Sequence, residues 1–444
     1  MSLRPYQQSA VDYALNSNNT ILVLPTGSGK SHVISGIALG LGGRTIVLQP
    51  TKEILESNYG KAIDAGIVGA SIFSASVGTK EIGKVTYATI GSIIKQTKYL
   101  NDIGGVECII IDECHLVNSK SGQYLEFIRE LNPKKIIGLT ATPYRLHSNS
   151  MGSQIKLLNR TRPKVFNEIG YAVQTQDLVK NNFLFSPTVI VSQVNKSYLK
   201  PNSTGAEYSD NSVDKFIDYN NINERCAIAC DWAIKNGCKH ILIFTQSLAN
   251  TSIVLKKLES YNITNASIDG KTPVKEREKV LNEFKTGKIQ AVVNVGVLTT
   301  GYDFPELDCI IVARPTLSLA LHYQIFGRVV RCAKDKKKAF VLDLVDNNAL
   351  FGNPLDMYIT KNDTGLWDIL TKNGRLTSTY VGDNESESTM PFGKYRGTKL
   401  KDLPLDYIDW YVNNNKKDAL RHKLYAEKQR REIYETSSDR LSSN

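Results

Sequence analysis

Along the first 185 residues, short apolar segments rich in β-branched residues alternate with segments of helical length. A short, continuous apolar run is typical of a strand buried on both faces, as in a parallel sheet covered by helices. The predicted strands are residues 20–24, 45–48, 85–88, 108–111 and 136–139, and the predicted helices are residues 4–16, 30–41, 52–65, 90–98 and 121–131. This alternation predicts a parallel α/β domain over residues 1–185.

A polar segment rich in Asn and Ser, residues 195–222, interrupts the pattern before the alternation resumes. The predicted strands are then residues 240–244, 265–268, 290–294, 308–313 and 338–344, and the predicted helices are residues 223–236, 248–260, 273–286 and 318–331. We therefore expect a second α/β domain over residues 186–350, with a cleft between the two domains.

Beyond residue 350 the pattern weakens. Residues 351–389 are predicted to be a linker, because the stretch 377–390 is acidic and rich in hydroxyl side chains. Residues 390–444 are predicted to form a small C-terminal module with a glycine-rich β-hairpin and a charged helix over 404–435. The predicted fold class is α/β, with two tandem parallel-sheet domains and a small accessory domain.

The net charge of +11 comes from 55 Lys and Arg against 44 Asp and Glu. Such an excess favours a polyanionic partner, since each phosphate that is neutralised releases counterions; a charge that only keeps the protein soluble is the alternative. No apolar run reaches the roughly 18 residues of a membrane span, and the N-terminal sequence has no signal-peptide core. We expect a cytoplasmic protein that makes no membrane contact.

The seven cysteines include no C-x-x-C pair. Cys226, Cys230 and Cys238, with His240, form the one set that approaches a zinc site, and their spacing does not fit one. We expect no zinc, and buried free thiols in a reducing compartment.

The segment TILVLPTGSGKSHVIS, residues 20–35, places a glycine-rich turn between a strand and a helix. Backbone N–H groups of such a turn and the helix N-terminus bind phosphates. Lys30 would reach the β- and γ-phosphates and Ser31 would ligate Mg²⁺, although Leu24 replaces the first glycine of the usual pattern. The predicted phosphate-binding residues are Thr26, Gly27, Ser28, Gly29, Lys30 and Ser31.

The segment ECIIIDECH, residues 107–115, delivers Asp112 and Glu113 to the carboxyl end of a strand, where open α/β sheets bind ligands. Asp112 would hold Mg²⁺, and Glu113 would orient or deprotonate the attacking water. An acidic pair at a strand end is commonly only solvated, but its place after a phosphate loop favours the catalytic interpretation.

Five segments, TGSGKS, DECH, TATP (140–143), TTGYDFP (299–305) and QIFGRVVR (324–331), occur in an order and spacing that resemble the superfamily 2 DExH-box helicases, over residues 3–346. Within that superfamily the chain is most similar to RadD-type and phage UvsW-type DNA recombination and repair helicases, through LRPYQQSAV, GLTATPYRL, VNVGVLTTGYDFP and RPTLSLALHYQIFGR. The resemblance implies two RecA-like domains, with ATP and Mg²⁺ as cofactors.

The same resemblance assigns further roles. It implies that Gln7 reads the adenine edge while Arg4 packs against the adenine ring, and that Gly301 and Asp303 lie at the ribose. It also implies that His115, Thr140 and Thr142 couple the nucleotide state to the grip on nucleic acid.

The final segment supplies Gln324, Arg328 and Arg331. Because residues i and i+3 of a helix share a face, the two arginines are predicted to point together into the cleft when it closes. There they would stabilise the negative charge that develops on the γ-phosphoryl group. The alternative is a pair of surface arginines that contact DNA phosphates.

Nucleic-acid contacts are expected on the opposite edge of both domains. Most of the candidates are small or hydroxylic, which suits contact with the sugar–phosphate backbone without sequence readout; taken singly, each is as well explained as an ordinary loop residue. They are Pro50, Thr51, Lys52, Thr89, Ser92, Thr245, Gln246, Gly270, Lys271 and Thr299.

Residues 390–412 are similar to a small module at the C-terminus of some bacterial and phage nucleic-acid enzymes. Basic and aromatic residues interleave there, which suits stacking on unpaired bases, and the candidates are Lys394, Tyr395, Arg396 and Lys399. A packing module is the alternative, with a core of Phe392, Leu403, Tyr407 and Trp410.

The predicted function is an ATP-dependent DNA helicase or translocase that unwinds or branch-migrates forked or branched DNA in recombination, repair or replication. The protein is expected to be monomeric or weakly associating, in the cytoplasm of a bacterium or of a phage-infected host. The alternatives are an RNA helicase, an ATP-gated nucleic-acid clamp that does not unwind, and a restriction-complex motor, for which the chain has no nuclease signature.

Overall fold

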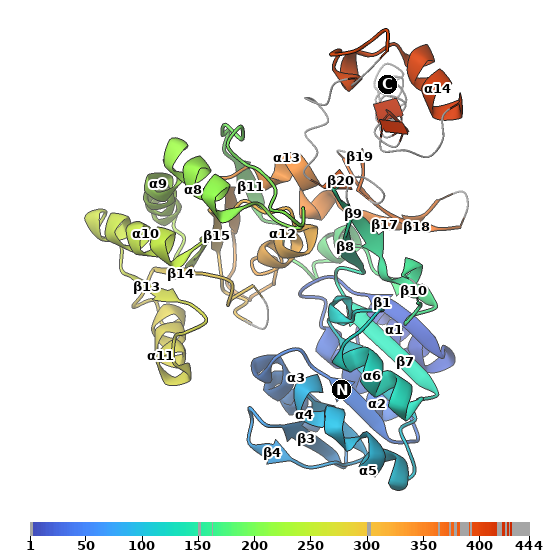
Figure 1. Cartoon of the computed structure of the whole chain (residues 1–444). Coiled ribbons are helices and arrows are strands. Elements are labelled where there is room, and N and C mark those ends of the chain that lie inside the picture. The colour runs from blue at the N-terminus through green and yellow to red at the C-terminus, as the bar shows by residue number, and fades with distance from the viewer. Residues whose placement is uncertain are drawn as a thin grey trace.

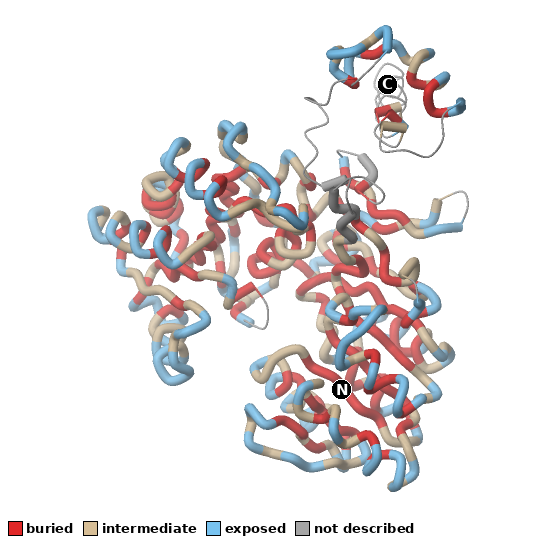
Figure 2. The backbone as a smooth tube through the Cα atoms, viewed as in Figure 1, coloured by how far each residue is buried: buried red, intermediate tan, exposed pale blue. Residues whose placement is uncertain are grey.

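The structure, a computed structural model, contains two parallel sheets covered by helices and two small antiparallel sheets (Figure 1). It describes residues 3–149, 152–161, 163–299, 303–362, 365–372, 374–376, 380–381, 390, 393–414, 420–421, 424–425 and 427–428. Buried residues concentrate along the strands of the two large sheets, and the exposed ones along the outer helices (Figure 2).

The first sheet has eight strands in the order β10-β1-β7-β6-β2-β5-β3-β4, and every pair except β3–β4 is parallel. The strands are β1 (Asn19–Val23), β2 (Thr45–Leu48), β3 (Ala70–Ser74), β4 (Thr79–Lys80), β5 (Val85–Ala88), β6 (Cys108–Asp112), β7 (Lys135–Thr140) and β10 (Glu168–Ala172). The sequence did not predict β3, β4 and β10, which lie toward the edges, because their partly exposed residues break the continuous apolar pattern of the central strands.

The helices of the first domain cover both faces of this sheet. They are α1 (Pro5–Asn16), α2 (Lys30–Gly40), α3 (Lys52–Asp64), α4 (Ile90–Ile93), α5 (Thr97–Asp102), α6 (Gln123–Leu131) and α7 (Thr175–Lys180). The single helix predicted over 90–98 is instead α4, a 3₁₀ turn η1 (Ile94–Gln96) and the start of α5.

The second sheet has six parallel strands in the order β11-β16-β15-β12-β14-β13. They are β11 (Thr188–Val191), β12 (Ile241–Phe244), β13 (Asn265–Ile268), β14 (Ala291–Asn294), β15 (Cys309–Val312) and β16 (Phe340–Asp343), covered by α8 (Asp210–Tyr219), α9 (Ile222–Lys235), α10 (Leu248–Ser260), α11 (Val274–Lys285) and α12 (Leu319–Phe326). Helix α8 lies inside the segment predicted as a polar interruption, and its buried residues Val213, Phe216 and Ile217 have the spacing of a helical face.

The predicted linker over 351–389 is wrong for its first part. The chain continues through α13 (Asn347–Phe351) and η4 (Pro354–Asp356) into an antiparallel sheet of β17 (Tyr358–Lys361), β18 (Trp367–Thr371) and β19 (Gly374–Arg375). A second small sheet joins β8 (Tyr144–Asn149), β9 (Gly152–Leu157) and β20 (Tyr380–Val381). The acidic stretch 377–390 lies largely outside the described residues.

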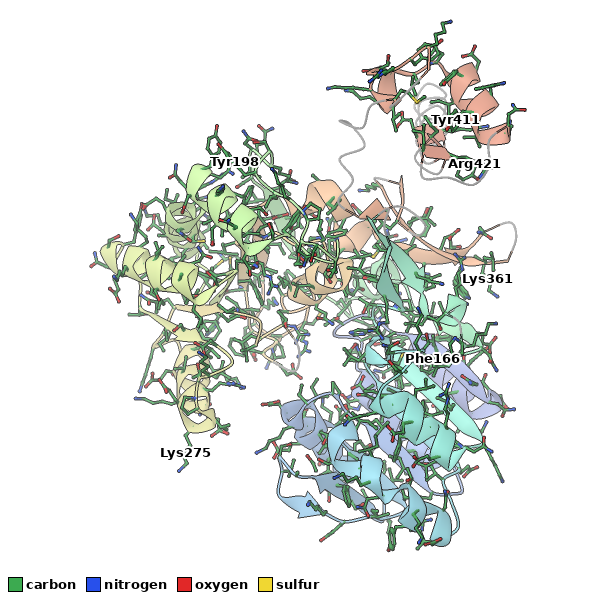
Figure 3. The ribbon with its side chains drawn as sticks, viewed as in Figure 1. Phe166, Tyr198, Lys275, Lys361, Tyr411 and Arg421 are labelled. Carbon is green, nitrogen blue, oxygen red and sulfur yellow. The ribbon has the colours of Figure 1, made fainter. Side chains whose placement is uncertain are left out.

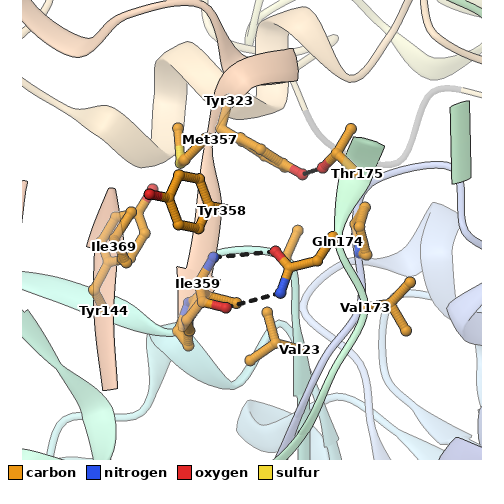
Figure 4. A pocket seen from close by; sticks show the side chains of 13 residues that line it. Val23, Tyr144, Val173, Gln174, Thr175, Tyr323, Met357, Tyr358, Ile359 and Ile369 are labelled. Carbon is orange, nitrogen blue, oxygen red and sulfur yellow. Dashed lines mark hydrogen bonds between the residues drawn. The ribbon is translucent and has the colours of Figure 1, made fainter. Parts of the chain in front are cut away.

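The β17–β19 sheet docks on the first domain, although it follows the second domain in sequence. The Gln174 amide donates to the Ile359 carbonyl (2.8 Å) and accepts from the Ile359 N–H (3.1 Å), as Figure 4 shows. The Trp367 indole donates to the Ile169 carbonyl of β10 (2.9 Å). The chain therefore returns to the first domain after it has formed the second.

A small apolar pocket lies at this junction (Figure 4). It is lined by Val23 and Tyr144 of the first domain, Tyr323 of α12, and Met357 and Ile359 around β17. The Thr175 and Tyr323 hydroxyls are 2.7 Å apart and close one side of it. The first domain, α12 and the β17–β19 sheet thus pack together at one place.

Replacing Gln174 by Leu keeps the volume of this side chain but removes both hydrogen bonds to Ile359, which is buried. Leaving a buried backbone group unpaired costs about 1–3 kcal/mol. We expect faster amide exchange at Ile359 and faster proteolytic cleavage around β17. Gln8→Leu is the control, because Gln8 is exposed on α1; equal protection of β17 in both variants would contradict the docking role.

The C-terminal module folds around Met390, Leu400, Leu403, Ile408 and Tyr411. Its helix α14 (Leu405–Asn414) follows a 3₁₀ turn η5 (Leu400–Asp402), and Arg421 donates to the Val412 carbonyl (2.6 Å; Figure 3). Within the segment predicted as a hairpin, the described residues show a turn over 394–397. The Met390 N–H donates to the Thr398 carbonyl (2.8 Å), and the Gly397 N–H donates to the Met390 carbonyl (2.8 Å).

The predicted core of this module is partly wrong. Trp410 is 55% exposed, and Tyr411 takes the buried position on α14 instead. The reason is the helical period, since Ile408, Tyr411 and Val412 share the face that packs on Leu400 and Leu403. Phe392 lies outside the described residues. None of the helices in the described ranges is both long and apolar enough to cross a membrane.

Candidate functional site

The phosphate loop, residues 24–31, connects β1 to α2 at the carboxyl edge of the first sheet. Gly27 and Gly29 have φ values of 84° and 80°, in the left-handed region where a side chain is strained. A Cβ on Gly29 would lie 2.6 Å from the Gln7 amide nitrogen. The two glycines let the loop fold tightly against α1 directly before the N-terminus of α2, a position that suits phosphate binding.

Lys30 and the acidic pair meet above the strand ends. The Lys30 ammonium is 3.2 Å from a Glu113 carboxylate oxygen. Asp112, 4% exposed, accepts a hydrogen bond from the Asn58 amide of α3 (3.2 Å). Glu113 has a φ of 50°, the left-handed conformation that non-glycine residues adopt at a cost. Strained backbone of this kind clusters at functional sites, which supports a specific role for the Glu113 carboxylate.

The two carboxyl groups have opposite pKa shifts. Burial, reinforced by the neighbouring Glu113 charge, raises the pKa of Asp112. Burial alone would also raise the pKa of Glu113, but the Lys30 ammonium and the His115 ring outweigh it and lower that pKa. Glu113 is therefore ionised at neutral pH, as a group that holds a water molecule for attack needs to be.

His115 connects Glu113 to the TATP segment. Its Nδ1 atom lies 3.3 Å from a Glu113 oxygen, 2.9 Å from the Thr140 hydroxyl and 3.3 Å from the Thr142 hydroxyl. Both threonines are buried at the end of β7. His115, Thr140 and Thr142 were predicted to couple the nucleotide state to the grip on nucleic acid. Together they form one polar chain behind the acidic pair.

The Lys61 ammonium of α3 contacts the Ser31 hydroxyl and lies within the influence of the Asp112 charge. Lys61 donates to the Ser31 hydroxyl at 3.3 Å, and the Asp112 charge acts on the same ammonium. Burial, with a contribution from Arg331, lowers the pKa of Lys61. The sequence did not predict Lys61 or Asn58, although both are polar residues on the inner side of α3 near Leu55 and Ala62.

The donor set fits Mg²⁺. Hydroxyl and carboxylate oxygens are the ligands that Mg²⁺ prefers, and it is commonly held by one or two protein groups together with substrate phosphates. No group of three His, Cys, Asp or Glu side chains suitable for a metal occurs among the residues that the structure describes. Ser31 and Asp112 would therefore supply only part of the coordination.

The expected adenine site lies at the start of α1. The Arg4 guanidinium lies 4.5 Å from the centre of the Phe183 ring, which also contacts Tyr6. Gln7, 3% exposed, donates to the Ser28 carbonyl (2.9 Å) and accepts from the Arg4 N–H (2.9 Å). Arg4 already stacks on an aromatic ring, and Gln7 is bound to the phosphate loop. No sequence pattern points to Phe183, which lies far from Arg4 along the chain.

The arginine segment, residues 324–331, differs from its prediction. Helix α12 ends at Phe326, so Arg328 lies in a turn and Arg331 beyond it, and the two do not share a helical face. A Cβ on Gly327 would lie 2.6 Å from the Thr26 side chain. This close approach to the phosphate loop requires glycine, and it lies directly after the last residue of α12.

Both arginines nevertheless reach the cleft. Arg328 is 6% exposed and donates to the Gln324 carbonyl, and the Glu113 charge acts on it. Arg331 forms an ion pair with Asp303 and packs against the phosphate loop at Gly27. Burial lowers the pKa of each arginine to about 10, which leaves both charged at neutral pH.

These groups line one cleft of about 520 Å³ between the two domains. It brings together the predicted residues Arg4, Gln7, Thr26, Gly27, Gly29, Lys30, Ser31, Asp112, Glu113, Asp303, Arg328 and Arg331. The Ser28 carbonyl accepts a hydrogen bond from Gln7, and the Gln324 carbonyl accepts one from Arg328, so both hold residues that line the cleft. Gly301 lies outside the described residues. Cys332, expected to be buried, is exposed at the rim, while the other six cysteines are buried and free.

The predicted nucleic-acid residues follow the carboxyl ends of strands in both sheets. In the first sheet this is the same edge as the phosphate loop, so the expectation of an opposite edge is wrong. Thr51 caps α3 by accepting from the Ile54 N–H (3.4 Å), next to Pro50 and Lys52. The Thr89 and Ser92 hydroxyls are 2.9 Å apart at the start of α4.

In the second domain, Gly270 and Lys271 are exposed and Gln246 is half-buried. Thr245 and Thr299 are buried, and their hydroxyls bind Thr251 and the Gly296 carbonyl. Both hydroxyls are thus bound within the protein, and contact of these two side chains with nucleic acid stays a prediction.

The C-terminal module displays an aromatic ridge of Tyr395, Tyr407 and Trp410. The Tyr395 and Tyr407 ring centres are 4.6 Å apart, and Tyr407 and Trp410 stack at 5.8 Å. The Lys394 ammonium lies 5.2 Å from the Tyr395 ring centre. Exposed basic side chains border the ridge, namely Lys394, Arg396 and Lys399.

Together, the phosphate loop and acidic pair of one parallel-sheet domain and the arginines of another define a two-domain protein with a phosphate-binding cleft. Comparison with known families agrees. Residues 1–145 match the family described as "Type III restriction enzyme, res subunit", and residues 224–333 match "Helicase conserved C-terminal domain". Residues 385–416 match the family described as "Putative quorum-sensing-regulated virulence factor".

Two relatives are the "Putative ATP-dependent helicase IRC3" of Saccharomyces cerevisiae, 24% identical over 77% of this chain, and the "DNA 3'-5' helicase XPB" of Kineococcus radiotolerans, 23% identical over 76% of it. The chain spans 51% and 58% of the length of these two relatives. A fragment of a "putative HsdR subunit of a type I restriction enzyme" from Vibrio vulnificus shares the fold, with a TM-score of 0.60 and 19% identity over 79% of this chain and 66% of that one.

The chain belongs to superfamily 2 of helicases, and its two large domains have the RecA-like fold of that superfamily. The nearer likeness to RadD-type and UvsW-type helicases stays a prediction.

Proposed function

We propose that this protein is an ATP-dependent DNA translocase or helicase that acts on forked or branched DNA in recombination, repair or replication. The observation that carries the proposal is the shared cleft, in which Lys30 and Glu113 of the first domain face Arg328 and Arg331 of the second. A site divided between two domains makes hydrolysis depend on their approach, and a motor needs this dependence to convert hydrolysis into movement.

The ion pair between Lys30 and Glu113 suggests how hydrolysis is controlled. Phosphates bound in the loop would draw the Lys30 ammonium away from Glu113. The Glu113 carboxylate would then be free to hold a water molecule in line with the γ-phosphoryl group and to accept its proton. Arg328 and Arg331 would neutralise the charge that develops on the transferred group. Ser31 and Asp112 would hold Mg²⁺, whose positive charge would add to this neutralisation.

The polar chain from Glu113 through His115 to Thr140 and Thr142 provides a route for coupling. When Glu113 turns toward water, His115 loses one of its acceptors and its contact with the threonines changes. Because Thr142 lies directly before the β8–β9 sheet and the Tyr144 pocket, this change reaches the junction of the domains. We propose that the affinity for nucleic acid changes with the hydrogen bonds among Glu113, His115 and the two threonines.

DNA is the proposed substrate. A relative named as a DNA helicase supports it, as do the net charge of +11 and the exposed basic residues around the aromatic ridge. Forked or branched DNA is favoured by the likeness to RadD-type and UvsW-type helicases and by a separate module suited to unpaired bases. We also propose that the protein works in the cytoplasm as a monomer or a weakly associating species.

The test is the ATPase rate with single-stranded DNA, duplex DNA, forked DNA and RNA, together with displacement of a labelled strand from the fork. We expect the strongest stimulation and strand displacement with forked DNA. Stimulation by RNA alone would replace the proposal with an RNA helicase. Tight binding to forks without displacement or branch migration would favour an ATP-gated clamp, and translocation along duplex without displacement would favour a restriction-type motor.

Replacing Trp410 by Ala is expected to weaken binding to single-stranded and forked DNA by roughly 5- to 100-fold, since stacking on an aromatic ring contributes about 1–3 kcal/mol per base. The fold should be retained because Trp410 is exposed. The measurement is fluorescence anisotropy of labelled DNA, and the control is Tyr99→Ala, an exposed aromatic on α5 of the first domain. Equal affinities for the two variants would exclude the aromatic ridge as a binding surface.

A further inference from the structure

Helix α3 connects two parts of the molecule that have different expected roles. Its N-terminus, at Thr51 and Lys52, lies in the predicted nucleic-acid loop. Its later turns carry Asn58 and Lys61 into the cleft, where Asn58 donates to Asp112 (3.2 Å) and Lys61 donates to Ser31 (3.3 Å). One helix thus supplies polar contacts to both residues that would ligate Mg²⁺.

The position of the Lys61 ammonium is unusual for a lysine. Lysine side chains ordinarily extend into water, whereas this one is directed into the cleft beside the Arg331 guanidinium. Lys61 belongs to the last turn of α3, where a cation is favoured by the helix dipole. That effect explains a lysine at this position, but it does not require contact with the Ser31 hydroxyl of another helix.

The Ser31 hydroxyl and the Asp112 carboxylate account for the direction of the side chain. They supply the oxygen contact and the negative charge that an ammonium group needs when it is removed from water. These are the same two oxygen donors that fit Mg²⁺. A lysine ammonium and a divalent cation cannot occupy one set of oxygens at the same time.

We propose that Lys61 is a built-in cation of the nucleotide site, which competes with Mg²⁺ for the Ser31 hydroxyl oxygen beside the Asp112 charge and binds the phosphates of a nucleoside di- or triphosphate. The inference rests on the proposed nucleotide site and adds a residue that sets how strongly nucleotide binding depends on metal. With Ser31 and Asp112 holding Mg²⁺, the Lys61 side chain would leave the Ser31 hydroxyl and turn toward the phosphates. When metal is scarce, its charge alone holds the nucleotide in the cleft.

The test is binding of a fluorescent, ribose-labelled ADP to the full-length protein, first in EDTA and then at increasing Mg²⁺ concentrations. In Lys61→Met, we expect the metal-free Kd to rise by roughly 10- to 100-fold, the loss that corresponds to a hydrogen bond from a charged group. We also expect the midpoint of the Mg²⁺ titration to move to a lower concentration, because the competing cation is gone. Lys61→Arg should keep most of the metal-free affinity.

Lys80→Met is the matched control, since it removes the same charge from an exposed position of the first domain, on β4. Lys61→Gln provides a second variant, and circular dichroism verifies that each variant folds. If Lys61→Met and Lys61→Gln both match Lys80→Met, the ammonium acts only on its own helix and the inference fails. An unchanged Mg²⁺ midpoint would also overturn the competition. Absence of nucleotide binding by the unaltered protein would instead refute the proposed function itself.

Discussion

Replacing Arg331 by Ala is expected to lower the DNA-stimulated ATPase rate by roughly 10³- to 10⁵-fold, the range observed when an inserted arginine is removed from phosphoryl-transfer enzymes. Arg331 packs on the phosphate loop at Gly27 and pairs with Asp303, so its guanidinium is already placed at the edge of the phosphate site. The measurement is steady-state ATP hydrolysis at saturating forked DNA. Binding of labelled ADP should change much less than the rate, because the arginine acts mainly on charge that develops during the reaction.

Lys288→Ala is a suitable control for this variant, since Lys288 is an exposed cation of the second domain, away from the cleft. Arg328→Ala belongs in the same experiment, because Arg328 is more deeply buried than Arg331 and interacts with the Glu113 charge. A rate near that of the unaltered protein in Arg331→Ala, with a large loss in Arg328→Ala, would assign the transition-state role to Arg328 alone. Normal rates in both variants would contradict the divided site.

Replacing Glu113 by Gln should reduce ATP hydrolysis by roughly 10²- to 10⁴-fold, the contribution typical of general acid–base catalysis. The substitution keeps the size of the side chain but removes the charge that pairs with Lys30 and His115. Since Lys30 is then no longer held by a carboxylate, nucleotide binding should be unchanged or tighter. Single-turnover hydrolysis and labelled-ADP titration measure the two effects separately.

Glu126→Gln, an exposed position of α6 in the same domain, controls for the loss of one negative charge. Loss of ADP binding together with hydrolysis in Glu113→Gln would point to a damaged phosphate loop rather than a missing base. Full activity of Glu113→Gln would mean that another group positions the water, and the strained backbone at Glu113 would then need a different explanation.

The sequence predicted well those features that depend on local pattern. Strands such as β2 and β6 are buried along their whole length and so carry a continuous apolar run. The phosphate loop and the acidic pair follow directly from such strands, and for this reason the local pattern alone places Lys30, Asp112 and Glu113 at one sheet edge.

Features that depend on contact between distant segments were predicted less well. The helix predicted through Arg328 and Arg331 ends at Phe326 instead, and the next residue, Gly327, packs on Thr26, a contact that no local pattern encodes. The burial of Thr245 likewise depends on a neighbouring strand, since its hydroxyl donates to the Asn294 carbonyl (3.4 Å).

The sequence pattern also failed to reveal Lys61 as a residue of the site, because only the packing of α3 against the phosphate loop brings its ammonium to Ser31. The β17–β19 sheet has no clear signal in the sequence because its strands are short and partly exposed, and they are held mainly by Gln174 and Trp367 contacts with the first domain.

The return of the chain to the first domain has a mechanical consequence. The second domain is attached to the first at two places, through the segment between α7 and β11 and through the docked β17–β19 sheet. A body held at two points rotates most easily about the line that joins them, whereas a body on a single flexible connection moves in every direction. Opening and closing of the cleft would therefore follow one rotational path, and in the proposed motor each cycle would then advance the protein by a similar distance.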